Sequence, residues 1–191
     1  MGMTTDVTIQ PFTGTYAVQP AFSTIAFAVS HSGAFRFRGV FADVDGALRA
    51  AHGDLALSGA ARVASLSVQE PAALRAHLLA PDFFDAERHP LITFRSTAVR
   101  LADDRSAEVE GDLTIRGVTR RLRAWGEWSA PRDAGYGEVA GLELRTQVDR
   151  RAFGIEWQTP MPSGEDTLGW RVDLEFDLSL MRVDAAADGA P

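Results

Sequence analysis

Residues 170–180 of the chain read WRVDLEFDLSL, and this stretch decides the class of fold. Apolar side chains occupy every second position from Trp170 to Leu180, and the positions between them carry a charge, except at Ser179. Successive side chains of a β-strand point to opposite faces of a sheet, so strict alternation is typical of a strand with one buried face. Residues 170–180 are therefore predicted to form a long strand with one face buried and the other exposed to solvent.

Weaker alternation recurs along most of the chain. It predicts further strands over residues 16–18, 23–31, 35–41, 64–69, 91–101, 108–115, 120–128 and 139–148. Turn signals lie between these segments at Ser32-Gly33, Asp45-Gly46, Arg116-Gly117 and 133–135. Strands joined by short turns favour an antiparallel meander, which forms a closed barrel or a sandwich. We therefore predict an all-β fold, an antiparallel barrel of about eight strands.

Two segments depart from this pattern. Residues 71–79 read PAALRAHLL, in which Pro at the first turn and the Ala and Leu content favour one short helix. Residues 154–169 contain several Pro and Gly and predict a long loop at one end of the barrel. Long loops in compact domains are often functional.

The length of 191 residues suits one domain and is short for two. We predict a flexible N-terminal segment over residues 1–13, one barrel domain over 14–183 and a disordered tail over 184–191. The first and last residues of a domain are seldom held unless they pack on its core.

The composition argues against several classes of function. The net charge is −7, whereas a surface that binds nucleic acid is normally basic. Without cysteine there is no thiolate nucleophile, and four scattered histidines do not predict a metal site. Ser23 has no evident base beside it, so we assign no catalytic residue.

No stretch of the sequence approaches the ~20 apolar residues of a membrane span. The N-terminus also lacks the basic region and the apolar run of a signal peptide. We therefore expect a water-soluble, cytoplasmic protein, or a periplasmic or secreted one if a signal peptide has been removed.

The strand predicted near the N-terminus has two faces that avoid charge. Ile25, Phe27 and Val29 share one face with His31, and small residues occupy the other face. This pattern indicates a wall that is packed on one side and faces a cavity on the other. A barrel of about eight strands holds either packed side chains or one small ligand, and the pattern does not separate these alternatives.

Three motifs, with one supporting segment, follow one another along the chain. They are FSTIAFAVSH at 22–31 with RGVF at 38–41, HLLAPDFFDAERHPLITF at 77–94, and GDLTIRGVT at 111–119, supported by RRAFGI at 150–155. In order and spacing they resemble the YceI-like family, the lipocalin-like polyisoprenoid-binding proteins, over roughly residues 14–183. Phe22 and Arg75 depart from that pattern, which often has His and an acidic residue at these positions.

The resemblance implies a lipocalin-like barrel with a hydrophobic channel that holds the isoprenoid tail of a quinone-like or prenol-like lipid. No cofactor is expected apart from such a lipid. The expected partner is a hydrophobic small molecule or lipid, and a homodimer is left open. The candidate ligand-binding residues are Phe27, His31, Phe37, Phe41, His77, Phe83, Phe84, Phe94, Phe153 and Trp157.

Several histidines, phenylalanines and arginines of the chain each have two interpretations. His31 and His77 are predicted either to hydrogen-bond a ligand or to satisfy loop carbonyls. Phe83 and Phe84 either gate the mouth of the barrel or plug it. Arg150 and Arg151 either meet an anionic head group or, as the preferred interpretation, form a solvated pair at the end of a strand.

Three functions remain open at this point. The leading hypothesis is carriage, storage or sequestration of an isoprenoid lipid. The alternative is a cavity enzyme that cyclises or isomerises a polyene substrate, with His31 or His77 as acid or base. A barrel with a filled core is the third.

Overall fold

The computed structural model describes residues 10–183. Residues 1–9 and 184–191, which include most of the predicted N-terminal segment and all of the predicted tail, lie outside the described part. Phe12 belongs to the predicted flexible segment, yet it is buried against Tyr16 and Trp128. Packing on the core therefore begins before the predicted start of the domain at residue 14.

Strands make up most of the described chain. They are β1 (Gly14–Val18), β2 (Thr24–His31), β3 (Phe35–Phe41), β4 (Val44–Ala51), β5 (Asp54–Arg62), β6 (Leu91–Leu101), β7 (Ser106–Ile115), β8 (Val118–Asp133), β9 (Glu138–Asp149) and β10 (Leu168–Val183). The helices are α1 (Ala72–Leu79) and three short 3-10 helices, η1 (Pro20–Phe22), η2 (Val63–Ser65) and η3 (Arg150–Phe153). The single predicted helix is confirmed as α1, and the predicted long loop joins η3 to β10.

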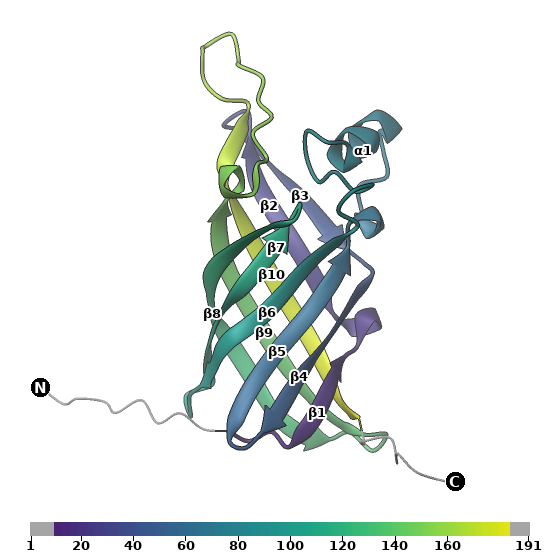
Figure 1. The fold of residues 1–191 in the computed structure, drawn as a ribbon, viewed down its shortest axis with the longest axis vertical. Coiled ribbons are helices and arrows are strands. Elements are labelled where there is room, and N and C mark those ends of the chain that lie inside the picture. Colours follow the sequence, from purple (N-terminus) through teal and green to yellow (C-terminus); the bar gives the residue numbers. More distant parts are fainter. Residues whose placement is uncertain (1–9, 184–191) are drawn as a thin grey trace, which may run out of the picture.

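Eight strands close into a barrel. Their order is β1-β4-β5-β6-β7-β8-β9-β10, and β10 pairs back with β1. Every neighbouring pair is antiparallel. The prediction of a lipocalin-like antiparallel barrel with one short helix is confirmed (Figure 1).

The hairpin β2–β3 extends this wall at one end of the barrel. Residues 172–177 of β10 pair with β2, whereas residues 180–183 of the same strand pair with β1. On the far edge of β3, Val40 exchanges hydrogen bonds with Ser67. The edge of β3 is therefore covered by the segment after β5, and Figure 1 shows α1 at the same end of the barrel.

Strands β4 and β5 were not predicted. Their sequences, VDGALRAA and DLALSGAAR, are rich in Ala and Gly, which are depleted in strands, and the predicted turn at Asp45-Gly46 lies inside β4. Gly46 pairs directly with Gly59, and a Cβ atom on Gly46 would lie 2.6 Å from the carbonyl oxygen of Ser58. Glycine is required at these two positions because the strands approach each other closely, and not because the chain turns there.

The predicted strand over residues 64–69 is wrong. Its first residues belong to η2, and Leu66 makes an isolated bridge with Phe41. Leu66 is fully buried, so the alternation seen in the sequence reflects packing beneath the edge of β3 and not a place in the sheet.

The barrel end opposite α1 is closed by an aromatic plug of Phe12, Tyr16 and Trp128. The ring of Phe12 stands edge-on to Tyr16, with 5.0 Å between the centroids, and the indole nitrogen of Trp128 donates to the carbonyl of Ala102 at 3.0 Å. The hydroxyl of Tyr16, whose side chain is 0% exposed, donates to the carboxylate of Glu138. Burial and this hydrogen bond raise the pKa of Tyr16 to about 12.

The Tyr16 hydroxyl predicts a loss of stability in alkali. Unfolded tyrosine releases its proton near pH 10.0, before folded Tyr16 does, so the free energy of unfolding falls as the pH rises from there towards 12. We expect a fall of about 1 kcal/mol between pH 9 and pH 11. Tyr16→Phe should remove it, as measured by urea unfolding.

Tyr136, the second tyrosine, provides the control because its side chain is exposed. Tyr136→Phe should leave the alkaline fall intact. The chain has no lysine, so few other side chains titrate in this range. An unchanged fall in Tyr16→Phe would contradict the assignment.

Candidate functional site

Two apolar cavities lie inside the barrel. The central cavity, of about 60 Å³, is lined by residues of every strand except β3. Its lining is apolar apart from Asp45, Ser58 and Thr93 on the β4–β6 side. The upper cavity, of about 90 Å³, lies towards the α1 end and is lined by apolar residues and by Arg150.

One layer of side chains separates the two cavities. Its members line both of them and are Ile25, Ile92, Leu113 and Phe176. They come from β2, β6, β7 and β10, which lie on different sides of the barrel. The two cavities therefore adjoin, and we refer to these four residues as the dividing layer.

Glycines allow two large rings to lie close to the wall. A Cβ atom on Gly39 would be 2.5 Å from the ring of Phe27, and one on Gly111 would be 2.4 Å from the ring of Phe94. Each ring thus occupies the space that a side chain on the neighbouring strand would fill. The rings cover the wall and leave the cavities beside them.

Three rings from separate segments form a cap over the α1 end. His77 lies on α1, Phe83 follows that helix and Trp157 belongs to the long loop. Ring centroids are 4.9 Å apart for His77 and Phe83, 5.0 Å for His77 and Trp157, and 5.3 Å for Phe83 and Trp157. We call these three residues the aromatic cap. His77 Nε2 lies 3.6 Å from a carboxylate oxygen of Asp82.

The structure brings six of the ten predicted ligand-binding residues to a cavity wall. Phe27, Phe41, Phe83, Phe84 and Phe153 line the upper cavity, and Phe94 lines the central one. These six aromatics come from β2, β3, β6, η3 and the segment after α1, so the barrel gathers residues that are far apart in the sequence.

The other four candidates lie around the cavities without lining them. Phe37 packs against Phe27, with 6.1 Å between the ring centroids. His31 ends β2, and its Nδ1 lies 3.0 Å from the hydroxyl of Ser32. His77 and Trp157 belong to the aromatic cap. Neither histidine lines a cavity, although His77 contacts Phe83, which lines the upper one.

The structure contradicts the preferred interpretation of Arg150 as a solvated residue. The side chain of Arg150 is buried with 4% of the residue exposed, whereas Arg151 is exposed and pairs with Asp149. Residues 142, 144 and 148 of β9 point inward, and the same alternation places position 150 inward as well. Extending the period by one step would have found it.

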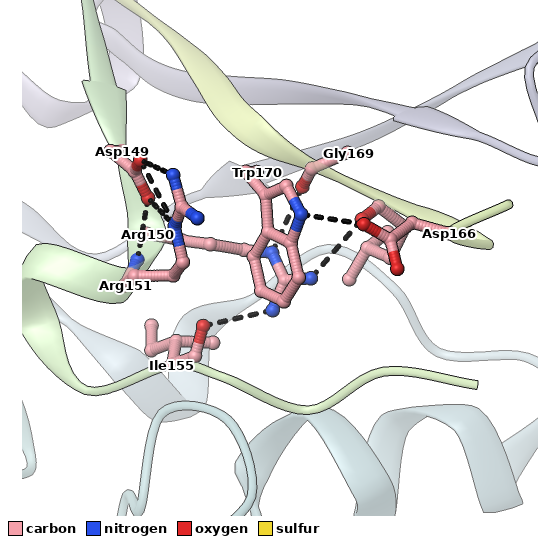
Figure 2. A network of polar contacts seen from close by, with 8 residues as sticks. Asp149, Arg150, Arg151, Ile155, Asp166, Gly169 and Trp170 are labelled. Carbon is pink, nitrogen blue, oxygen red and sulfur yellow. Dashed lines mark hydrogen bonds and ion pairs between the residues drawn. The ribbon is translucent and has the colours of Figure 1, made fainter. Parts of the chain in front are cut away.

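The guanidinium of Arg150 binds main-chain carbonyls at both ends of the long loop (Figure 2). Its bonds run from Nε to Gly169 at 2.9 Å, from Nη1 to Ile155 at 2.8 Å and Trp157 at 2.9 Å, and from Nη2 to Leu168 at 3.1 Å. Carbonyls of loops at a barrel end need donors, and Arg150 supplies four of these bonds. It therefore fixes the loop that carries Trp157.

Trp170 covers the outer side of the two arginines (Figure 2). The guanidinium carbon lies 4.2 Å from the ring centroid for Arg150 and 4.9 Å for Arg151, and the indole nitrogen donates to Asp166 at 2.6 Å. Burial lowers the pKa of Arg150, and the charges of Asp149 and Asp166 partly oppose that effect.

Two further arginines hold the α1 end in the same manner. Arg75 donates to the carbonyls of Ala64, Leu66 and Val68, which ties α1 to the segment after β5. Arg116 donates to the carbonyls of Gly154 and Pro81. Both segments that bear the aromatic cap are thus attached through arginine.

Residues 10–183 contain neither a metal-binding cluster nor a membrane-spanning helix. This part of the chain has no group of three or more His, Asp or Glu side chains placed to hold a metal ion. None of its helices is long and apolar enough to cross a membrane.

Sequence comparisons place this barrel among known relatives. The model of the YceI-like domain matches residues 16–180. A UPF0312 protein of Pseudomonas fluorescens (strain SBW25) is 31% identical over 160 residues, which are 81% of this chain and 78% of the relative. A UPF0312 protein of Pseudomonas putida (strain W619) is 35% identical over 81 residues, and this match spans 42% of either chain.

Solved structures share the fold at low sequence identity. BcnA of Burkholderia cenocepacia superposes with a TM-score of 0.68 at 19% identity, over 85% of this chain and 98% of that one. A polyisoprenoid binding domain from Saccharophagus degradans gives a TM-score of 0.65 at 12% identity, over 90% and 100%. With its barrel, its helix at one end and the match over residues 16–180, the chain belongs to the YceI-like family.

Proposed function

We propose that this protein binds a long apolar isoprenoid lipid, quinone-like or prenol-like, inside its barrel and carries, stores or sequesters it. The observation that carries the proposal is the pair of adjoining apolar cavities under the aromatic cap. A related fold described as a polyisoprenoid binding domain supports the choice of ligand class. Burial of an apolar tail contributes about 25 cal/mol per Å² before the costs of ordering.

The size of the cavities sets a condition on binding. Their volumes of about 60 and 90 Å³ are small beside the roughly 300–1,000 Å³ of typical ligand pockets. A chain-like ligand that occupies both cavities must therefore displace side chains of the dividing layer. Ile25 and Phe176 are only partly buried and belong to this layer, so it has room to move.

The alternative of a cavity enzyme gains no support from the geometry. His31 and His77, its candidate acid or base, lie outside both cavity linings. A general acid or base must come within hydrogen-bond reach of the reacting atom. Binding without chemistry is the function that the arrangement favours.

Native mass spectrometry of the purified protein, followed by organic extraction, tests the proposal. We expect a lipid adduct of defined mass, or uptake of an added isoprenoid quinone or prenol at one per chain, with the lipid recovered intact. Recovery of a new product with the mass of the substrate would instead favour the enzyme. A protein that takes up no isoprenoid would contradict the proposal.

A larger side chain in the central cavity should exclude the isoprenoid tail of the lipid from it. Ala124 is buried on β8 and lines this cavity, so Ala124→Leu places three further carbons in existing space. We expect unfolding free energy to change by less than about 1.5 kcal/mol while lipid uptake falls several-fold. Thermal unfolding and lipid stoichiometry measure the two effects.

Ala107 on β7 is the matched control, because it is equally buried but lines neither cavity. Ala107→Leu should overpack the core and cost about 1–3 kcal/mol of stability. Equal destabilisation by the two substitutions, with uptake unaffected by Ala124→Leu, would argue for a filled core.

Gly39→Ala should narrow the upper cavity. The atoms nearest to the new Cβ belong to the ring of Phe27 and the side chain of Leu66, so the ring has to swing away from the wall. Phe27 lines the upper cavity, and we expect lipid affinity to fall about tenfold or more. Titration with an isoprenoid quinone measures it.

Adding Phe27→Leu to Gly39→Ala provides the control for this prediction. The smaller side chain should relieve the clash and recover most of the affinity. If the double variant binds as weakly as Gly39→Ala, displacement of the Phe27 ring is not the cause.

A further inference from the structure

We propose that a groove on the outer wall of the barrel, between β8 and β9, is the entrance of the lipid site. The polar head of the bound lipid stays in this groove, and its tail passes Phe153 into the cavities. The inference rests on the proposed function and adds the position of the head group and the route of the tail. The groove, which we call the β8–β9 groove, is lined by residues 120–123 and 125 of β8, 146–149 of β9, and 152 and 153 of η3.

The β8–β9 groove lies where the two strands separate. The ladder between β8 and β9 ends at the pair of Trp125 and Arg145. Beyond that pair, within residues 10–183, residues 118–124 of β8 pair with β7 alone and residues 146–149 of β9 pair with β10 alone. Strand hydrogen bonds therefore do not close this part of the wall.

Polar contacts cross both ends of this opening. At one end the hydroxyl of Thr146 donates to the carbonyl of Arg123 at 2.8 Å. At the other end the guanidinium of Arg116 donates to the carbonyl of Gly154, directly after η3, and to that of Pro81, which follows α1. The opening is thus a window in the side wall that lies towards the α1 end.

One layer of apolar side chains separates the β8–β9 groove from the cavities. Leu122 lines both the groove and the central cavity, whereas Val148 and Phe153 line both the groove and the upper cavity. Phe153 is only 2% exposed, and it lies on the short helix η3. Its side chain can move without breaking a strand ladder, so Phe153 is the residue that opens and closes the window.

A second groove, outside β4 to β7, also borders the central cavity, but its wall is closed. Strands β4 and β5 pair without interruption from Val44 to Ala51, and β5 pairs with β6 from Ser58 to Arg62. A lipid tail could enter there only by breaking main-chain hydrogen bonds. Entry through the β8–β9 groove requires the displacement of side chains alone.

The distribution of polar surface places the head group outside the cavities. Almost no polar surface faces either cavity, so a head group with oxygen atoms would lose its hydrogen bonds there. The β8–β9 groove combines an apolar floor with exposed side chains that include Arg120, Trp125 and Gln147. A head group in the groove keeps its contact with water while the tail is buried.

The size of the β8–β9 groove also suits a head group. Its volume is about 500 Å³, within the roughly 300–1,000 Å³ of typical ligand pockets, whereas each cavity is far smaller. The indole of Trp125 lines it with 55% of the residue exposed, which offers a flat apolar surface to a ring such as that of a quinone.

A reversible label in the groove tests the proposal. The chain has no cysteine, so a single introduced thiol can be modified alone. Ala152 lines the β8–β9 groove and neither cavity, and a bulky methanethiosulfonate reagent on Ala152→Cys should fill the groove. We expect the dissociation constant of an isoprenoid quinone to rise about tenfold or more, and reduction of the label to restore it. Tryptophan fluorescence follows the titration.

Asp82→Cys is the matched control, because Asp82 is exposed and lies beside His77 of the aromatic cap. The same label there should change the dissociation constant by less than about twofold. An effect at this position as large as that on Ala152→Cys, or no effect on Ala152→Cys, would overturn the inference.

Phe153→Leu tests the route of the tail. A smaller side chain obstructs the window less, so we expect uptake and release of the quinone to accelerate several-fold in stopped-flow measurements. Phe84→Leu is the control, because Phe84 lines the upper cavity but not the groove. Equal acceleration in the two variants would show an effect of cavity size and overturn the role of Phe153.

The outcomes separate the two proposals. Quinone binding that is insensitive to the label on Ala152→Cys overturns the groove and leaves the lipid-binding function standing. Failure of the wild-type protein and of unlabelled Ala152→Cys to bind the quinone overturns the proposed function and the groove with it.

Discussion

Hydrogen bonding along both edges of β10 is the constraint on which the rest of the barrel depends. One edge pairs with β9 over residues 171–181, and the other pairs first with β2 and then with β1. The pairing with β1 closes the ring, and the pairing with β2 extends the wall beyond it. Because the strand is long and strictly alternating, its apolar face lines both cavities while its charged face stays in water.

The two ends of the barrel are closed by different means. At the β1 end, buried aromatic rings and the Tyr16 hydroxyl form a plug within the sheet. At the α1 end no strand of residues 10–183 closes the opening, and Arg75, Arg116 and Arg150 hold non-strand segments through their carbonyls. Such segments can move without breaking the barrel. We therefore propose the α1 end as the entrance for the ligand of the proposed function.

The sequence predicts the elements whose side chains alternate in polarity, including β10 and the core of β6 to β9. It misses β4 and β5, because Ala and Gly carry little polarity signal where strands approach closely. It also identifies six aromatic residues that the structure places on a cavity wall, since large rings on strand faces have few places other than the interior. Arg150 was interpreted together with its exposed neighbour Arg151, although one further step of the alternation of β9 places position 150 inward.

A crystal structure of the protein grown with an isoprenoid quinone tests the central claim most directly, because it shows whether one ligand occupies both cavities. The account predicts continuous density from the upper cavity, through a displaced dividing layer, into the central cavity. Ile25 and Phe176 should then adopt new rotamers. Density confined to the outer surface, with the dividing layer in place, would contradict the account.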